Sequence, residues 1–183
     1  MLDSIESPLG PIWLAFDDQA LRALDFEPYR DRMEALLKRH YGSVTLTRGP
    51  APAAAVDALK RYFDGDLAAL DSVPVATAGT PFQREVWAAL RQVPAARATT
   101  YGQLAAAIGR AGASRAVGLA NSLNPVAIIV PCHRVIGSDG KLTGYAGGLE
   151  RKSWLLAHER KHSAPPAFEL TQAQAGQSGV SVG

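Results

Sequence analysis

A short segment near the middle of the chain, residues 74–79, constrains the fold most. Its sequence is Pro-Val-Ala-Thr-Ala-Gly. Because proline and small residues support neither a helix nor a well-packed strand, this segment is predicted to be a linker. A chain of 183 residues with 47% hydrophobic residues can supply packed cores on both sides of it. We therefore expect an N-terminal domain with its linker at residues 1–79 and a second domain at residues 80–162.

Three strands followed by two helices are predicted before the linker. Residues 2–5, 12–16 and 20–26 are apolar or alternating runs separated by turn-forming Pro, Gly and Asp residues, which is typical of a β-meander. Helical hydrophobic spacing follows at residues 30–40 and 53–63. The first domain is therefore expected to be a small α+β unit.

Two capping boxes open helices after the linker. The tetrapeptides at 80–83 and 100–103 both begin with Thr and end with Gln, so side chain and backbone can cap each other. Gly109 can end the second helix, and a third helix over residues 113–123 should stop before Asn124-Pro125. Two short helices joined by a glycine-containing turn resemble a helix-turn-helix, whose second helix commonly enters a DNA groove.

The helix predicted at residues 113–123, which is the second of the helix-turn-helix, has a face of small residues that carries one arginine. The predicted outward face consists of Ser114, Arg115, Gly118, Asn121 and Ser122, and the predicted inward face of Ala113, Ala116, Val117, Ala120 and Leu123. Small side chains let a helix approach a groove closely, and a lone arginine can fill the gap left by an unstacked base. The alternative is a plain packed helix with a solvated side.

Charge is distributed unevenly along the chain. Residues 1–79 carry 8 Lys and Arg against 12 Asp and Glu, whereas residues 80–161 carry 11 against 4. A basic second domain suits a polyanion such as nucleic acid, although a merely solvated basic surface has the same composition.

Several classes of protein are excluded by what the sequence lacks. It has no run of about 18 apolar residues, and residues 1–6 lack the features of a signal peptide, so we expect a cytoplasmic protein with no membrane partner. A single cysteine cannot form an internal disulfide, and four scattered histidines give no zinc spacing. We expect no metal and no cofactor. The composition of residues 163–183, rich in Ala, Pro, Gln, Gly and Ser, predicts a disordered tail.

The only cysteine, Cys132, has neighbours that suit a nucleophile. It follows an apolar, β-branched run at residues 126–130, which is predicted to be a buried strand, and it precedes His133 and Arg134. Such neighbours are expected to lower the thiol pKa, with His133 acting through a water and Glu159 orienting the imidazole. The alternative is an inert, buried cysteine.

The sequence around Cys132 resembles a known active-site signature. Pro131-Cys132-His133-Arg134-Val135, preceded by Asn124-Pro125 and followed by Gly144-Tyr145-Ala146-Gly147-Gly148-Leu149, is similar to the signature of O6-alkylguanine-DNA alkyltransferases. The similarity extends from Phe82 to Glu159. It implies a ribonuclease H-like α/β domain followed by a winged-helix-like alkyltransferase domain with a helix-turn-helix.

The resemblance also implies an activity and four catalytic residues. The protein would transfer an alkyl group irreversibly from O6-alkylguanine in double-stranded DNA to Cys132, with O4-alkylthymine as a further candidate substrate. His133 would be the water-linked base and Glu159 would polarise it. Asn124 would brace the turn that carries the nucleophile. The protein would act as a monomer, once per molecule.

Further residues are assigned by the resemblance to substrate and DNA. Tyr101 would crowd the phosphate beside the lesion and donate a proton toward the leaving guanine. Tyr145, the Ala146 N–H and the main-chain carbonyls near Cys132 and Val135 would line the base pocket. Arg115 would fill the gap in the duplex, and the remaining DNA contacts would come from Ser114, Gly118, Ser122 and Arg134.

Two other functions are compatible with the same residues. A damage sensor would use the helix-turn-helix and the pocket while its cysteine stays idle. A Cys-His hydrolase would turn over repeatedly, although its base usually lies far from the nucleophile in sequence, whereas Cys132 and His133 are adjacent.

Overall fold

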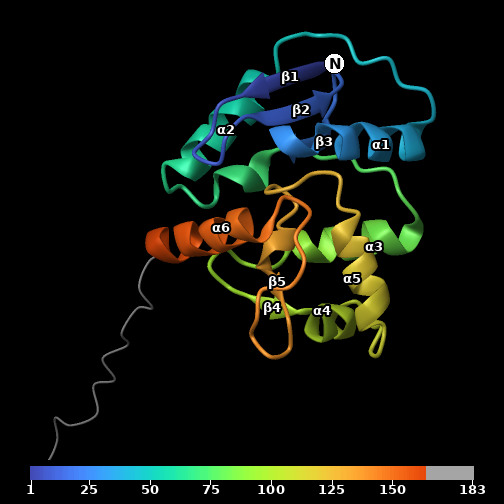
Figure 1. Ribbon diagram of the computed structural model, residues 1–183, viewed down its shortest axis with the longest axis vertical. Coiled ribbons are helices and arrows are strands. Elements are labelled where there is room, and N and C mark those ends of the chain that lie inside the picture. Colours follow the sequence, from blue (N-terminus) through green and yellow to red (C-terminus); the bar gives the residue numbers. More distant parts are fainter. Residues whose placement is uncertain (164–183) are drawn as a thin grey trace, which may run out of the picture.

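The computed structural model describes residues 1–163, and Figure 1 shows a β-sheet layer above a group of helices. The predicted tail, apart from Ser163, lies outside the described residues. Three strands form an antiparallel sheet in the order β1-β2-β3, as the meander predicts. The elements of the N-terminal half (residues 1–79) are β1 (Leu2–Ile5), β2 (Ile12–Phe16), β3 (Leu21–Phe26), η1 (Glu27–Tyr29), α1 (Arg30–Tyr41), α2 (Ala53–Phe63) and η2 (Ala69–Ser72).

Helices dominate the C-terminal half (residues 80–163). Both predicted capping boxes are formed: the Thr80 and Thr100 hydroxyls accept from the backbone N–H of Gln83 and Gln103, whose side chains accept in return. A two-residue parallel ladder joins β4 to β5. The elements are α3 (Pro81–Arg91), β4 (Thr99–Thr100), α4 (Tyr101–Ala107), α5 (Ser114–Ser122), η3 (Cys132–Arg134), β5 (Val135–Ile136) and α6 (Leu149–His162).

The strand predicted at residues 126–130 is wrong. The segment makes only one isolated parallel bridge, between Val126 and Leu24. It then turns on itself, because Val130 N–H donates to the Val126 carbonyl at 3.0 Å and Ile128 has φ of 68°. All five residues are buried. Their apolar side chains therefore indicate that the segment is buried between the two halves of the chain, and not that it forms a strand.

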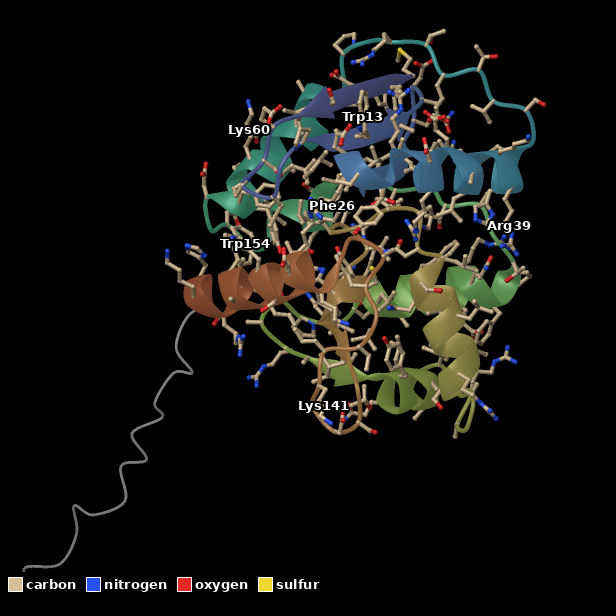
Figure 2. The ribbon with its side chains drawn as sticks, viewed as in Figure 1. Trp13, Phe26, Arg39, Lys60, Lys141 and Trp154 are labelled. Carbon is tan, nitrogen blue, oxygen red and sulfur yellow. The ribbon has the colours of Figure 1, made fainter. Side chains whose placement is uncertain are left out.

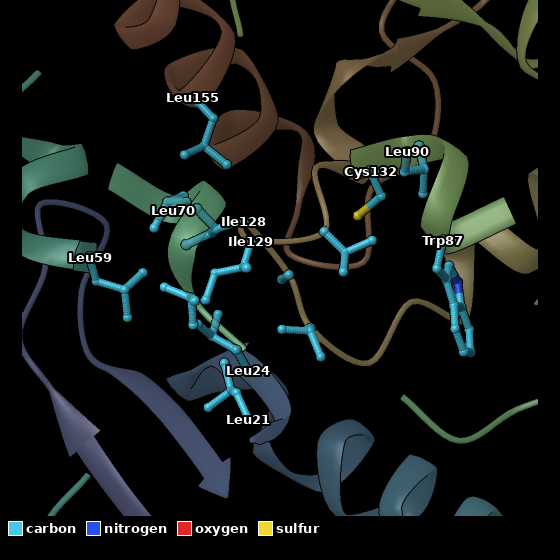
Figure 3. Packing of buried hydrophobic residues seen from close by; sticks show 14 of the residues in the cluster. Leu21, Leu24, Leu59, Leu70, Trp87, Leu90, Ile128, Ile129, Cys132 and Leu155 are labelled. Carbon is cyan, nitrogen blue, oxygen red and sulfur yellow. The ribbon is translucent and has the colours of Figure 1, made fainter. Parts of the chain in front are cut away.

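One hydrophobic core connects the halves of the chain. It joins Leu24 of the sheet to Trp87 of α3 and Leu155 of α6, and it includes Cys132 (Figure 3). A second, smaller cluster lies on the opposite face of the sheet, where Trp13 and Ala23 pack against Met33 of α1. The sheet is thus covered on both faces, and the turn that carries Cys132 is fixed by elements from both halves.

Within residues 1–163 no helix is long and apolar enough to cross a membrane. In the same part of the chain, no three His, Cys, Asp or Glu side chains come together as a metal site requires.

Candidate active site

Cys132 lies in the first turn of η3, directly after Pro131, with only 5% of its surface exposed. The side-chain amide of Asn124 donates to Cys132 Sγ at 3.0 Å and to the Val130 carbonyl at 2.8 Å. Asn124 Oδ1 in turn accepts from the Val126 N–H at 3.0 Å. Asn124 therefore contacts both the thiol and the turn leading to it.

Burial raises the pKa of the Cys132 thiol, and the hydrogen bond from Asn124 offsets only part of this effect. The expectation that neighbouring groups would lower the thiol pKa is therefore wrong. The resting site holds a protonated sulfur because few water molecules can solvate a thiolate there. A base must take the proton before the sulfur becomes nucleophilic.

His133 is the residue predicted from the sequence to act as that base. Its Nε2 lies 2.9 Å from Glu159 Oε1, and neither side chain is exposed. Burial lowers the pKa of His133 although Glu159 opposes this effect, so the imidazole is neutral near pH 7. The Nε2–H then donates to Glu159, which leaves Nδ1 as an acceptor. Nδ1 is buried and has no hydrogen-bond partner among the described residues.

Arg134 is not on the DNA surface, so that assignment is wrong. Only 7% of the residue is exposed, and its guanidinium donates to both carboxylate oxygens of Glu159, the shortest distance being 2.8 Å from Nη2 to Oε1. Nη1 donates to the Val93 carbonyl at 2.5 Å. Arg134 therefore balances the charge of Glu159, which is why His133 does not need to be a cation.

Glu159 also accepts hydrogen bonds from α2 and from the segment between α3 and β4. The Tyr62 hydroxyl of α2 donates to Oε1 at 3.0 Å, and the Ala96 N–H donates to Oε2 at 3.0 Å. Burial raises the pKa of Glu159, but the hydrogen bonds from His133 and Arg134 and the positive charge of Arg134 outweigh it and hold that pKa well below its usual range. The carboxylate is therefore ionised, which the orienting role predicted for it requires.

One wall of the site is formed by the glycine-rich loop before α6. The Tyr145 hydroxyl is buried without a partner among the described residues, and its ring meets the edge of His133 with centroids 6.5 Å apart. The Phe26 ring of β3 also packs edge-on against Tyr145, with centroids 6.4 Å apart, and Figure 2 shows Phe26 where the sheet meets the helices. Ala146, beside Tyr145, is half-buried.

Lys152 is a site residue that the sequence analysis missed. Its side chain is fully buried, and its ammonium donates to the Val135 carbonyl at 2.6 Å and to the Thr143 carbonyl at 2.7 Å. Burial lowers the pKa of Lys152 to about 8. The Val135 carbonyl, predicted to receive the guanine amine, thus already has one donor. No local pattern distinguishes this lysine from the exposed charges of the same helix.

A surface hollow of about 470 Å³ lies between α4, α5 and the turn after β5. Tyr101 contributes its hydroxyl, which lies 3.1 Å from Thr143 Oγ1, and the exposed Arg115 projects from α5. Four predicted DNA or substrate residues therefore meet in one place. The lining residues are Thr100, Tyr101, Gly102, Ser114, Arg115, Gly118, Gly137, Ser138 and Thr143.

The predicted faces of α5 need two corrections. Asn121, expected to point outward, is buried and its amide donates to the Cys132 carbonyl at 3.5 Å. Ala116, expected to point inward, is exposed. The reason is that α5 packs against both α3 and α4, which rotates its buried side toward the turn bearing the nucleophile. Ser122 is exposed at the end of the helix, outside the hollow.

Comparisons with known proteins give a consistent result. The ribonuclease-like domain of 6-O-methylguanine DNA methyltransferases matches residues 2–77, and the DNA binding domain of the same family matches residues 81–161. A methylated-DNA–protein-cysteine methyltransferase of Salmonella typhimurium is 56% identical over 160 residues, covering 86% of this chain and 94% of the relative. One from Methanosarcina barkeri is 46% identical over 160 residues, covering 87% and 97%.

Solved structures agree. The Mycobacterium tuberculosis protein OGT, crystallised in complex with DNA, superposes with a TM-score of 0.74 at 42% identity, over 87% of this chain and 92% of that one. The O6-methylguanine-DNA methyltransferase of Pyrococcus kodakaraensis superposes at 0.66 with 25% identity, over 86% and 97%. The expected fold class is thereby confirmed. The chain belongs to the family of methylated-DNA–protein-cysteine methyltransferases.

Proposed function

We propose that this protein repairs DNA by transferring an alkyl group from O6 of guanine to Cys132, irreversibly and once per molecule. The observation that carries this proposal is the contact of Asn124 with Cys132 Sγ beside a buried His133–Glu159 pair, close to a helix-turn-helix. The DNA complex of the M. tuberculosis relative supports DNA as the partner.

The substrate base must leave the helix to react. O6 lies on the Watson–Crick edge of guanine, so its alkyl carbon is out of reach of a protein sulfur while the base is stacked. We assign to Arg115 the role of filling the vacated space, because it is exposed and lines the hollow at α5. Ser114 and Gly118 line the same hollow and would contact the backbone, with Ser122 at the far end of the helix.

The chemistry is a single displacement. His133 Nδ1 takes the thiol proton through a water, and the resulting thiolate attacks the alkyl carbon. A C–S bond forms while the C–O bond breaks, and its electron pair moves onto guanine. Tyr101 supplies a proton toward the purine ring, while Tyr145 and the Ala146 N–H donate hydrogen bonds to O6. The carbonyls near Cys132 and Val135 accept the exocyclic amine.

The product explains why the protein reacts only once. A thioether has no acidic proton and is a poor leaving group, so no residue of this site can restore the thiol. Regeneration would require breaking a stable C–S bond at Cys132.

We further propose the operating context. The protein acts as a monomer in the cytoplasm, where reducing conditions keep a lone cysteine as a thiol. Residues 1–79 support the site and residues 80–162 carry DNA binding and chemistry, with neither metal nor cofactor. O4-alkylthymine is the second candidate substrate, since it presents an alkyl carbon on the same base edge.

Mass spectrometry tests the transfer. The full chain is incubated with duplex DNA containing one O6-methylguanine, and the peptide containing Cys132 should gain one methyl group. Cys132→Ala should bind the duplex but gain nothing. An unchanged mass together with tight binding would establish a damage sensor instead. Repeated turnover of an ester or amide would establish a hydrolase.

A further inference from the structure

A side chain of the N-terminal half reaches the DNA-binding helix. Arg32 lies on α1, and its Nη2 donates to the Ser122 carbonyl at 2.6 Å and to the Asn124 carbonyl at 3.1 Å. Ser122 is the last residue of α5. The final carbonyls of a helix lack partners within the helix, and a guanidinium is well suited to satisfy them.

The guanidinium is fixed from its other side by a buried carboxylate. Asp25 of β3 is 1% exposed, and its Oδ2 accepts from Arg32 Nη1 at 2.6 Å. Asp25 Oδ1 accepts from the Phe26 N–H at 3.0 Å, which fixes the carboxylate itself. A guanidinium can donate to several acceptors in one plane. The Asp25–Arg32 pair therefore fixes the positions of the Ser122 and Asn124 carbonyls together.

The same contacts continue to the sulfur. The backbone carbonyl of Asn124 is held by Arg32, and the side-chain amide of Asn124 donates to Cys132 Sγ at 3.0 Å. A contiguous series of hydrogen bonds therefore runs from Asp25 through Arg32 and Asn124 to the nucleophile. It joins the sheet to the end of α5 and the turn before η3, which lie about a hundred residues further along the chain.

We propose that Arg32 is a positioning residue for alkyl transfer, which holds Asn124, and through it the Cys132 sulfur, in place relative to α5. The inference rests on the proposed function. It gives the N-terminal half a direct part in the reaction, since α1 lies on the sheet side of the molecule, away from the hollow at α4 and α5 (Figure 1).

Positioning makes a specific prediction about which step fails. Binding of DNA to the α5 face should persist without Arg32, because Arg32 does not line the hollow. The transfer step should suffer, since displacing a reacting atom by about 1 Å can cost about a hundredfold in rate. A residue that only stabilises the fold would instead lower the active fraction without changing the rate constant of the folded molecules.

The test uses the full chain with three variants. Arg32→Leu alone leaves the buried Asp25 carboxylate unpaired, which can unfold the protein. The double variant Arg32→Leu with Asp25→Asn removes both charges and is the main probe. Arg32→Lys keeps one donor. Arg39→Leu is the control for the loss of an arginine from α1, because Arg39 is exposed on the same helix (Figure 2).

Three quantities are measured for each variant: the single-turnover rate constant at saturating O6-methylguanine duplex, the Kd for unmodified duplex, and the melting temperature. We expect the rate constant of the double variant to fall about tenfold or more while Kd is unchanged, with Arg32→Lys intermediate and Arg39→Leu like wild type. An unchanged rate constant, or a loss confined to Kd, overturns the inference. Failure of the wild-type chain to accept a methyl group overturns the proposed function instead.

Discussion

His133 Nε2 lies 2.9 Å from Glu159 Oε1, and both side chains are excluded from solvent. The same carboxylate pairs with Arg134, so one residue of α6 holds two consecutive residues of η3. This arrangement fixes the tautomer of His133 and places its Nδ1 on the side away from Glu159. The candidate site therefore includes Glu159, near the end of α6, as well as Cys132.

Replacing Glu159 by Gln should destabilise the protein strongly. The amide keeps the shape of the side chain but leaves the buried Arg134 guanidinium without its counter-charge. Removing one partner of a buried ion pair typically costs about 3–5 kcal/mol. Urea denaturation should show this loss, whereas Glu150→Gln, an exposed change on the same helix, should leave the midpoint within error. Equal midpoints for both variants would contradict the role given to the pair.

Acidification should remove the stabilisation that Glu159 provides. Its pKa in the folded protein is held below the ordinary value of 4.5, so its contribution is present above that pH and is lost as the pH falls toward the folded pKa. His133 acts with the same sign, because burial lowers its pKa below 6.5 and only the unfolded imidazole takes up a proton there. The stability gap between wild type and Glu159→Gln should therefore narrow below pH 4.5. Parallel curves of unfolding free energy against pH would refute this account.

The reactivity of the free thiol should rise steeply with pH. Burial raises the pKa of Cys132 above the ordinary 9.0, so alkylation by iodoacetamide should still be accelerating at pH 9. Asn124→Ala removes the amide donor to Sγ and should slow alkylation further. The matched control is Asn121→Ala, since Asn121 donates to the Cys132 carbonyl and not to the sulfur. A rate that reaches its plateau below pH 8 would contradict the raised pKa.

Locally determined features could be predicted from the sequence. The Thr80 and Thr100 capping boxes depend on residues three positions apart, and both form as expected. Helix α2 has the predicted bounds, because its hydrophobic spacing and flanking residues suffice to define it. The candidate nucleophile, Cys132, was likewise singled out by a contiguous motif around it.

Features that depend on the other half of the chain could not be predicted. Residues 126–130 are apolar because both halves bury them, and a pattern of burial does not distinguish a strand from a compact turn. Arg134 follows Cys132 closely in sequence and was therefore predicted to contact DNA. Its partner Glu159 lies 25 residues away in sequence, and the ion pair with it keeps Arg134 buried. Arg32 and Lys152 likewise gain their roles only from distant backbone carbonyls.

Gly147→Ala should displace the loop that carries Tyr145. A Cβ at Gly147 would lie 2.5 Å from Phe26 Cε2 and 2.8 Å from Tyr145 Cε1, and neither rigid ring can move aside easily. We expect a slower transfer rate constant, measured in single turnover, with a smaller loss of DNA affinity. Gly144→Ala is the control in the same loop, because its Cβ would meet nothing within 4 Å. If both variants react equally fast, the close packing of Gly147 does not matter for transfer.

Arg115→Ala should separate base flipping from chemistry. Arg115 is exposed on α5 and lines the hollow, but no described hydrogen bond joins it to Cys132 or its neighbours. Unstacking a base costs a few kcal/mol, so losing the side chain that fills the gap should slow transfer from duplex DNA about tenfold or more. Transfer from free O6-methylguanine base requires no flipping and should keep its rate.

The control for this variant is Arg110→Ala. Arg110 precedes α5, is exposed, and pairs with Glu85 at 3.3 Å, so the substitution removes the same charge from the same region without opening the hollow. Its effect should be a modest, salt-dependent loss of affinity, since exposed arginines attract phosphates without reading the lesion. Equal losses for Arg115→Ala on duplex and free base would place Arg115 in the chemistry or the fold, and the flipping role would have to be abandoned.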